Sequence, residues 1–129
     1  MPGSEISVVI RAFNEEKYLP DLLEALNHQS VDDFETIVVD SGSLDRTREI
    51  AAQKADQLLR IQSHDFTFGH SLNVGIRKAS GRYIVIVSAH TLPASKRWLE
   101  KLVEPLHDSR TAMVYGRQLG ADASKFSET

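Results

Sequence analysis

Cysteine is absent from this chain of 129 residues, which also carries a single tryptophan and four prolines. Without cysteine, disulfides and thiolate metal sites are excluded. Long hydrophobic runs are missing too, because the longest one, Tyr83 to Val87, is far too short to cross a bilayer. The first five residues lack the basic start and apolar core of a signal peptide. We therefore expect a cytoplasmic protein with no transmembrane segment in this chain.

An excess of positive charge is also missing. Fifteen Lys and Arg residues stand against eighteen Asp and Glu residues, for a formal net charge of -3. Nucleic-acid-binding domains usually present a basic face, so we expect no nucleic acid partner. The chain has no G-x-G-x-x-G after its first apolar run, no Walker loop and no G-x-S-x-G elbow. These absences count against dinucleotide-binding, P-loop and serine-hydrolase sites.

What the sequence does contain is an alternation of β-branched apolar runs with segments of helical periodicity. The residues 17–28, 43–55, 72–79 and 98–106 show spacings typical of amphipathic helices. The apolar runs predict strands at residues 6–11, 34–40, 57–61, 82–87 and 112–115. Strands that alternate with helices of this length indicate βαβ units with right-handed crossovers. The predicted fold is therefore α/β, with a mostly parallel, doubly wound sheet.

Polar residues follow the strands at the points where they end. In a parallel sheet these ends meet at one edge, where ligands bind. We expect the site residues among those that follow the first, second and fourth strands and those on the third helix: Arg11, Ala12, Phe13, Asn14, Glu15; Asp40, Ser41, Gly42; Ser88, Ala89, His90; His70, Asn73, Arg77. Residues 63–70 read as a long polar and aromatic loop that leads into that helix.

Each of these candidates also has a structural interpretation. Asp40 can accept hydrogen bonds from a base or ribose, or it can shape the turn that follows its strand. His70, Asn73 and Arg77 share one helix face, which can bind a diphosphate near the helix N-terminus or simply face water. His90 can hold a metal, donate to a phosphate, or be an ordinary loop residue. The residue types alone leave these alternatives open.

Four stretches of the chain together resemble family 2 glycosyltransferases: residues 7–16, 37–47, 72–76 and 79–83. The resemblance covers roughly the first hundred residues. It implies the GT-A fold, whose N-terminal half is a Rossmann-like unit that binds a nucleotide diphosphate sugar. It also implies transfer of a hexose-type sugar to an acceptor hydroxyl with inversion at the anomeric carbon, and a role in bacterial polysaccharide or cell-envelope synthesis, where relatives often work at the inner face of the membrane.

Carried over onto this chain, the resemblance assigns Arg11, Ala12 and Phe13 to the nucleobase and ribose, and Asp40 to the base. Asn73 matches the Asn that the family carries in the helix before the fourth strand. The family usually has Asp-x-Asp at the end of that strand, where the carboxylates bind a divalent cation. This chain has Ser88-Ala89-His90 instead. The implied Mn²⁺ or Mg²⁺ is then anchored by His90, replaced by Arg and His side chains, or lost in a degenerate site.

The length of the chain is a second departure from the family. A complete GT-A domain needs on the order of twice this length, so we interpret residues 1–119 as the donor-binding part and residues 120–129 as a polar tail. The catalytic base is then expected outside this chain, as are most contacts with a saccharide or lipid-linked acceptor. The alternative function is a non-catalytic nucleotide-binding or assembly module, in which an unpaired sheet edge favours self-association.

Overall fold

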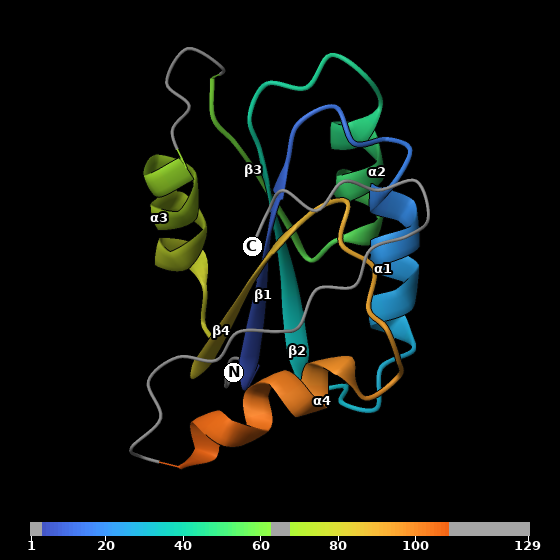
Figure 1. Ribbon diagram of the computed structural model, residues 1–129. Coiled ribbons are helices and arrows are strands. Elements are labelled where there is room, and N and C mark those ends of the chain that lie inside the picture. Colours follow the sequence, from blue (N-terminus) through green and yellow to red (C-terminus); the bar gives the residue numbers. More distant parts are fainter. Residues whose placement is uncertain (1–3, 63–67, 109–129) are drawn as a thin grey trace.

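Four parallel strands form one sheet in the computed structural model, which describes residues 4–62 and 68–108. The strands are β1 (Ile6–Ala12), β2 (Phe34–Asp40), β3 (Gln57–Arg60) and β4 (Tyr83–Ser88), and their spatial order is β3-β2-β1-β4. Figure 1 shows β1 and β2 at the centre of the sheet. The predicted parallel α/β architecture is confirmed. The predicted strand at 112–115 lies outside the described residues.

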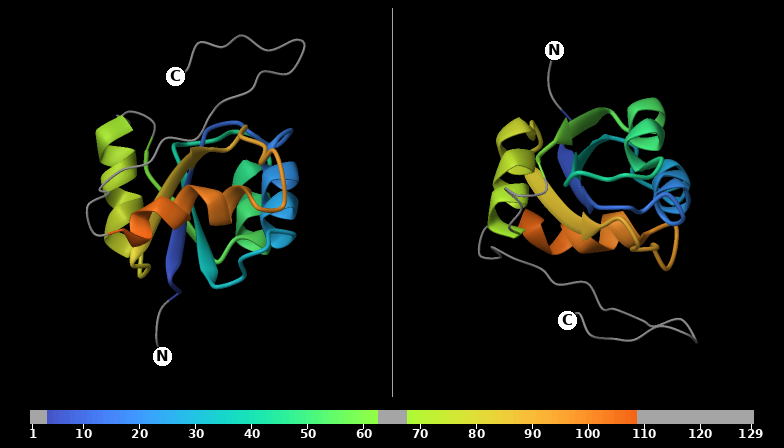
Figure 2. Two further views of the ribbon diagram at one scale, coloured as in Figure 1. Left: turned by 60° about the horizontal axis from the view of Figure 1, so that its bottom comes forward. Right: turned by 90° about the horizontal axis from the view of Figure 1, so that it is seen from above.

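Helices cover both faces of the sheet (Figure 2). One face of β1 presents Ile6, Val8 and Ile10 to the main core, which α1 (Leu19–Asn27), α2 (Thr47–Lys54) and α4 (Trp98–Val103) complete. The other face presents Val9 beside Ile37 and Val39 of β2, and α3 (Phe68–Lys78) packs against it. Because both faces are covered, β1 is an almost continuous apolar run, as expected for a central strand of a parallel sheet.

The approach of α3 to the sheet depends on Gly75. A Cβ atom built on this glycine would lie 2.5 Å from Val9 Cγ1 and 3.1 Å from Val39 Cγ2. A separation of 2.5 Å between carbon atoms does not occur in well-packed proteins, so a side chain at Gly75 would push the helix away from β1 and β2. The absence of a side chain at Gly75 therefore sets how tightly α3 packs.

The predicted helices differ from the observed ones at their ends, and α2 begins at Thr47, four residues after the predicted start. The third helix begins at Phe68, so Gly69 and His70 belong to α3 and not to a loop. Gly69 and His70 are poor helix formers, which hid this first turn in the sequence. The fourth helix ends at Val103 and continues as a 3₁₀ helix, η2 (Glu104–His107), because Pro105 cannot donate the backbone hydrogen bond that an α-helix needs.

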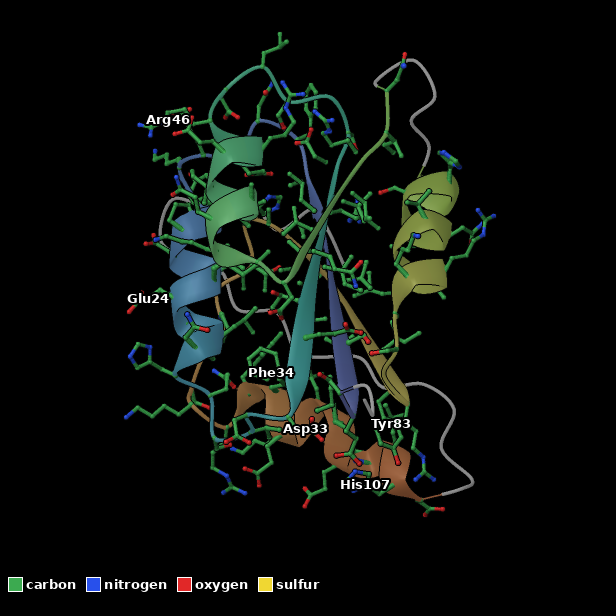
Figure 3. All side chains as sticks on the ribbon, turned by 180° about the vertical axis from the view of Figure 1, so that it is seen from behind. Glu24, Asp33, Phe34, Arg46, Tyr83 and His107 are labelled. Atoms are coloured by element: carbon green, nitrogen blue, oxygen red, sulfur yellow. The ribbon has the colours of Figure 1, made fainter. Side chains whose placement is uncertain are left out.

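The two ends of the sheet carry different groups. At the end where the strands begin, the rings of Tyr83 and His107 lie 5.2 Å apart, and Figure 3 shows both beside the start of β4. Arg46 is labelled at the other end, among the loops that follow the strands. The strand order reverses between β1 and β4, and ligands of doubly wound sheets bind at such a reversal, beyond the carboxyl ends of the strands. Within the described residues, no helix is long and apolar enough to cross a membrane.

Candidate functional site

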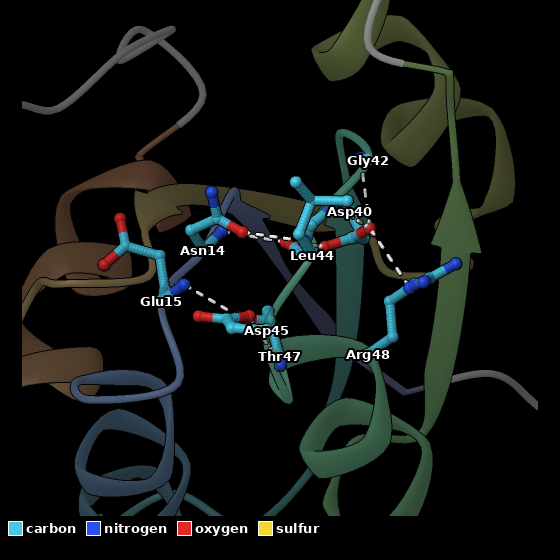
Figure 4. A network of polar contacts seen from close by, with 9 residues as sticks. Asn14, Glu15, Asp40, Gly42, Leu44, Asp45, Thr47 and Arg48 are labelled. Atoms are coloured by element: carbon cyan, nitrogen blue, oxygen red, sulfur yellow. Dashed lines mark hydrogen bonds and ion pairs between the residues drawn. The ribbon is translucent and has the colours of Figure 1, made fainter.

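Hydrogen bonds join the loop after β1 directly to the loop after β2 (Figure 4). Asn14 donates its backbone N–H to Ser43 Oγ at 2.8 Å, and its side-chain oxygen accepts the N–H of Leu44 at 2.8 Å. The N–H of Glu15 donates to Thr47 Oγ1 at 2.7 Å. Asn14 has a φ of 52°, a left-handed conformation that Asn adopts more readily than most residues. Asn14 therefore connects the two loops.

The same pair of loops is joined a second time at the start of α2. Glu16 donates its N–H to Asp45 Oδ2 at 3.2 Å, and its carboxylate accepts the N–H of Arg46 at 2.9 Å. Asp45 also accepts the N–H of Thr47, the first residue of α2, at 2.9 Å. Burial raises the pKa of Asp45, but hydrogen bonds from Thr47 and Glu16 outweigh burial and lower that pKa. Asp45 is therefore held as a carboxylate.

Asp40 organises the turn that follows β2. Its side chain is 1% exposed, Oδ2 accepts the N–H groups of Gly42 and Ser43 at 3.1 and 3.0 Å, and Oδ1 accepts the hydroxyl of Ser43. Arg48 Nε approaches Oδ2 at 3.9 Å (Figure 4). Gly42 has a φ of 96°, which favours glycine. This geometry matches the turn-forming alternative for Asp40, because both carboxylate oxygens already accept hydrogen bonds inside the protein.

The loop after β4 meets the loop after β1 through His90. His90 Nδ1 lies 3.0 Å from Glu15 Oε2 and 3.1 Å from the Ser88 hydroxyl. The side chain of Glu15 is 17% exposed, whereas that of His90 is 51% exposed. The ring of Tyr18 packs edge-on to the imidazole, with 6.4 Å between centroids. Three loops are thus connected at the point where the strand order reverses.

Several of the predicted site residues have little surface to offer a ligand. The side chains of Ala12 and Ala89 belong to the main core, and Ser41 is 4% exposed. Ala89 and Ser41 donate backbone N–H groups to Arg11 and Ala12, which extends the pairing of β4 and β2 with β1. Any contact of Ala12, Ser41 or Ala89 with a ligand would therefore be made mainly by backbone atoms.

Other predicted residues remain accessible at this edge. Phe13 is 50% exposed and follows β1 directly. Arg11 is half-buried, and burial lowers the pKa of its guanidinium. The three predicted residues on α3, His70, Asn73 and Arg77, are all exposed, and the helix N-terminus lies at the same end of the sheet as the three loops (Figure 1). The structure therefore brings the strand-end residues together and leaves the three α3 residues exposed to solvent. His70 is in the first turn of α3, but Arg77 is in its last turn, so the expected place of Arg77 near the helix N-terminus is wrong.

Asn14, Glu15 and His90 were among the predicted site residues, but the partners of Asn14 and Glu15 in the loop after β2 and at the start of α2 were not. Ser43, Asp45 and Thr47 accept backbone N–H groups from the neighbouring loop, and Glu16 accepts one in return. Their sequence pattern, small polar residues ahead of a helix, indicates capping. It does not show which backbone donors from another loop they accept.

The imidazole of His90 is the candidate ligand for a divalent cation at this edge of the sheet. Among the described residues, no three His, Cys, Asp or Glu side chains form a group that could hold a metal ion. His90 Nδ1 is within hydrogen-bond distance of the Glu15 carboxylate. In metal-bound histidines, the ring nitrogen that does not bind the metal usually donates to a carboxylate in this way. The donor set thus fits a cation that substrate phosphates help to hold, as they do for Mg²⁺, and not a cage made by the protein alone.

Known proteins with similar sequences are glycosyltransferases. The chain is 34% identical over 116 residues to an uncharacterized glycosyltransferase of Haemophilus influenzae, an alignment that covers 84% of this chain and 35% of the relative. It is 30% identical over 117 residues to the O-antigen chain rhamnosyltransferase RfbN of Salmonella typhimurium, with 89% and 37% covered. The chain thus spans about a third of the length of these relatives.

Two solved structures with the same fold contain a bound nucleotide or nucleotide sugar. The mannosyltransferase PcManGT from Pyrobaculum calidifontis, in complex with GDP-Man and Mn²⁺, superposes with a TM-score of 0.71 at 25% identity, over 82% of this chain and 33% of that protein. TarS of S. aureus in complex with UDP superposes with a TM-score of 0.68 at 26% identity, over 80% and 33%. Residues 7–128 match the sequence family described as Glycosyl transferase family 2. The chain belongs to glycosyl transferase family 2, and its fold is that of GT-A glycosyltransferases.

Proposed function

We propose that this chain binds the nucleotide diphosphate sugar donor of an inverting, hexosyl-type glycosyltransferase. The observation that carries the proposal is the joining of three loops, after β1, β2 and β4, at the point where the strand order reverses. Similar proteins with bound GDP-Man and UDP support a nucleotide ligand at this fold. Residues 1–119 would make up the donor-binding part, with 120–129 as a tail.

Different accessible residues would contact the base, the ribose and the diphosphate of the donor. Phe13 offers a half-exposed ring on which a nucleobase can stack. The two loops that Asn14 joins, and the turn that Asp40 shapes, would form the base and ribose pocket. His90, Ser88, His70 and Asn73 would lie toward the diphosphate, which the positive end of the helix dipole favours near His70 in the first turn of α3. Arg77, in the last turn of α3, would lie farther from it.

The proposed reaction is a direct displacement at the anomeric carbon. The acceptor oxygen forms the new glycosidic bond while the bond from the anomeric carbon to the diphosphate oxygen breaks, and the acceptor proton passes to a base. We expect that base outside this chain. The electron pair leaves with the nucleoside diphosphate, and hydrogen-bond donors placed near it stabilise the developing charge. A divalent cation held by His90 and the diphosphate would supply further positive charge there.

The acceptor is proposed to be a saccharide or lipid-linked sugar of a bacterial polysaccharide or cell envelope. The support comes from the relatives, one of which is an O-antigen chain rhamnosyltransferase. A cytoplasmic location at the inner face of the membrane would suit such an acceptor.

A non-catalytic nucleotide-binding or assembly module is the second candidate function. The replacement of Asp-x-Asp by Ser88-Ala89-His90 favours it, because it removes two carboxylates from the place where the family binds its cation. Release of UDP or GDP from a nucleotide sugar by this chain in the presence of an acceptor saccharide would exclude it.

The donor site can be tested with two aspartates that accept backbone N–H groups at opposite ends of the sheet. Asp40→Ala should weaken binding of nucleoside diphosphates, because the turn between Asp40 and Ser43 loses its acceptor. Asp56→Ala is the matched control, since Asp56 accepts the N–H of Thr36 at 2.7 Å, at the start of β2. Both variants should lose stability, but only the first should lose affinity in calorimetric titrations.

The Phe13→Ala variant tests nucleotide affinity without a large change in the stability of the fold. Its ring is half-exposed, so we expect little change in the free energy of unfolding and a clear loss of nucleotide affinity. Unchanged affinity in both Asp40→Ala and Phe13→Ala would place the donor site elsewhere.

A further inference from the structure

Glu15 and His90 are separated by 75 positions in the sequence, yet their side chains meet at 3.0 Å between Oε2 and Nδ1. One comes from the loop after β1 and the other from the loop after β4, the two strands between which the order of the sheet reverses. His90 stands at the last position of the Ser-Ala-His sequence that replaces the family's Asp-x-Asp. The contact therefore lies within the proposed donor site and involves its most distinctive residue.

The chemistry of the two groups decides which ring nitrogen carries the proton. A carboxylate only accepts hydrogen bonds, so Nδ1 must be the donor in its contact with Glu15. The Ser88 hydroxyl lies 3.1 Å from Nδ1 and 3.4 Å from Nε2, and because a hydroxyl can donate or accept it does not select either nitrogen. Glu15 is thus the group that selects the tautomer, leaving Nε2 with its lone pair in the neutral ring.

Burial makes this selection strong. The Glu15 side chain is 17% exposed, and the backbone that carries it is held by the hydrogen bond from its N–H to Thr47 Oγ1. The imidazole is 51% exposed and has Tyr18 against its edge. A largely buried carboxylate with an imidazole N–H on one side gains more from that hydrogen bond than an exposed pair does. The exposed part of the pair is the ring, which is the part that a ligand would meet.

We propose that Glu15 is a positioning residue, which holds the His90 ring through Nδ1 and so leaves the lone pair of Nε2 to bind a cation that the donor diphosphate also holds. This inference rests on the proposed function and adds to it a role for a residue of the loop after β1. Glu15 does not touch the donor in this account and acts only through His90. The pair takes the place at the end of β4 where the family has two carboxylates.

The test is nitrogen-15 spectroscopy of the histidine rings in the ligand-free chain at about pH 8, where an ordinary imidazole is neutral. The His90→Gln variant identifies the His90 signals by their loss. We expect a proton on Nδ1 and a bare Nε2 in the wild-type chain. Glu15→Gln should keep this tautomer, because the amide oxygen still accepts, whereas Glu15→Ala should lose it. Glu24→Ala is the control. It removes a carboxylate whose Oε2 lies 3.7 Å from Nδ1 of another histidine, His28, and it should leave the His90 signals unchanged.

Binding of UDP, GDP and dTDP, each with and without Mn²⁺, is then measured for the same variants. For the nucleotide that binds, we expect substoichiometric Mn²⁺ added with it to broaden the Nε2 signal more than the Nδ1 signal, because the paramagnetic ion would lie nearer to Nε2. Glu15→Ala should weaken the Mn²⁺-dependent affinity about tenfold, the lower end of what loss of a carboxylate that supports a metal-binding histidine costs. Glu15→Gln should restore most of that affinity.

Two results would overturn the proposal: the wild-type tautomer persisting in Glu15→Ala, or a wild-type ring with its proton on Nε2. Failure of every nucleotide to bind would instead overturn the proposed function, and with it the role of Nε2 toward a cation on the diphosphate. The ligand-free spectra alone decide whether Glu15 selects the tautomer of the His90 ring.

Discussion

At the scale of single residues, carboxylates in this protein act mainly by accepting backbone and hydroxyl hydrogens. Asp40, Asp45 and Glu35 each accept more than one such donor. Glu35 on β2 accepts the hydroxyls of Ser7 and Ser80 and the N–H of Ser80, and Ser7 accepts the N–H of Gly81 at 2.8 Å. Glu35 thereby ties β1 and β2 to the turn that leads into β4.

Glu35→Gln should therefore change how stability depends on pH. Burial raises the pKa of Glu35, but hydrogen bonds from Ser7, Ser80 and Gln57 outweigh burial and lower that pKa below the ordinary value of 4.5. A carboxylate with a lowered pKa stabilises the fold above its unfolded pKa and loses that contribution as the pH falls through its folded pKa. We expect the variant to be less stable than the wild type by about 1 kcal/mol at neutral pH, with the difference shrinking below pH 4.5.

Urea unfolding across this pH range measures the effect. Glu24→Gln is the control, because the side chain of Glu24 is 68% exposed on α1. A difference between Glu35→Gln and wild type that stays constant from neutral pH to well below the ordinary pKa of Glu35 would contradict the assignment.

At the scale of the elements, α3 is held close to the sheet by the absence of a side chain at Gly75. Gly69, one turn and a half earlier in the same helix, has no atom within 4 Å of the place where a Cβ would lie. Two glycines of one helix therefore have opposite environments, and this makes a matched pair of alanine variants available.

Gly75→Ala should destabilise the protein by about 1–3 kcal/mol, the usual cost of overpacking, because its Cβ would meet Val9 and Val39. Gly69→Ala should be neutral or stabilising by about 0.5–1 kcal/mol, because alanine favours the helix. The free energies of unfolding from urea titrations decide the matter. Equal stabilities for the two variants would mean that α3 can move away from β1 without cost.

Strand β4 differs from the central strands because β1 is its only partner among the described residues. Its residues Ile84 and Ile86 are 36% and 44% exposed. Exposed edge strands invite pairing with another chain, so we expect this chain to self-associate as its concentration rises. Ile86→Lys should abolish that association in sedimentation velocity experiments, while Leu92→Lys, at a 65% exposed loop position, should leave it unchanged. Association that is the same in both variants would place the contact elsewhere.

At the scale of the whole molecule, the sheet and its helices follow from the pattern of apolar residues. The four described strands and the helices between them were all predicted, because a buried parallel strand and an amphipathic helix each leave a periodic pattern in the sequence. The edge that carries the candidate site followed from the same reasoning. Gly69, His70 and Pro105 account for the differences at the ends of α3 and α4, since they change local backbone preference without breaking the apolar pattern.

The contacts inside the candidate site could not be predicted in the same way. The loops after β1 and β2 are joined by Asn14, Ser43 and Thr47, and the loop after β4 by Glu15 and His90. These contacts depend on distances between residues roughly 30 to 75 positions apart. Polar side chains leave no periodic signal of such pairing. Asp40 shows the limit most clearly, because the sequence allowed a ligand contact and a turn equally, and only the hydrogen bonds of its two oxygens favour the turn.

The central claim is that the joined loops form a nucleotide diphosphate site, and thermal unfolding of this chain with UDP, GDP and dTDP, each with and without Mn²⁺, tests it most directly. A ligand at about a hundred times its dissociation constant adds roughly 2.7 kcal/mol to stability, which should raise Tm by several degrees. We predict such a shift for one of the three nucleotides and none in Phe13→Ala. No shift with any nucleotide, at concentrations that stabilise PcManGT, would contradict the account.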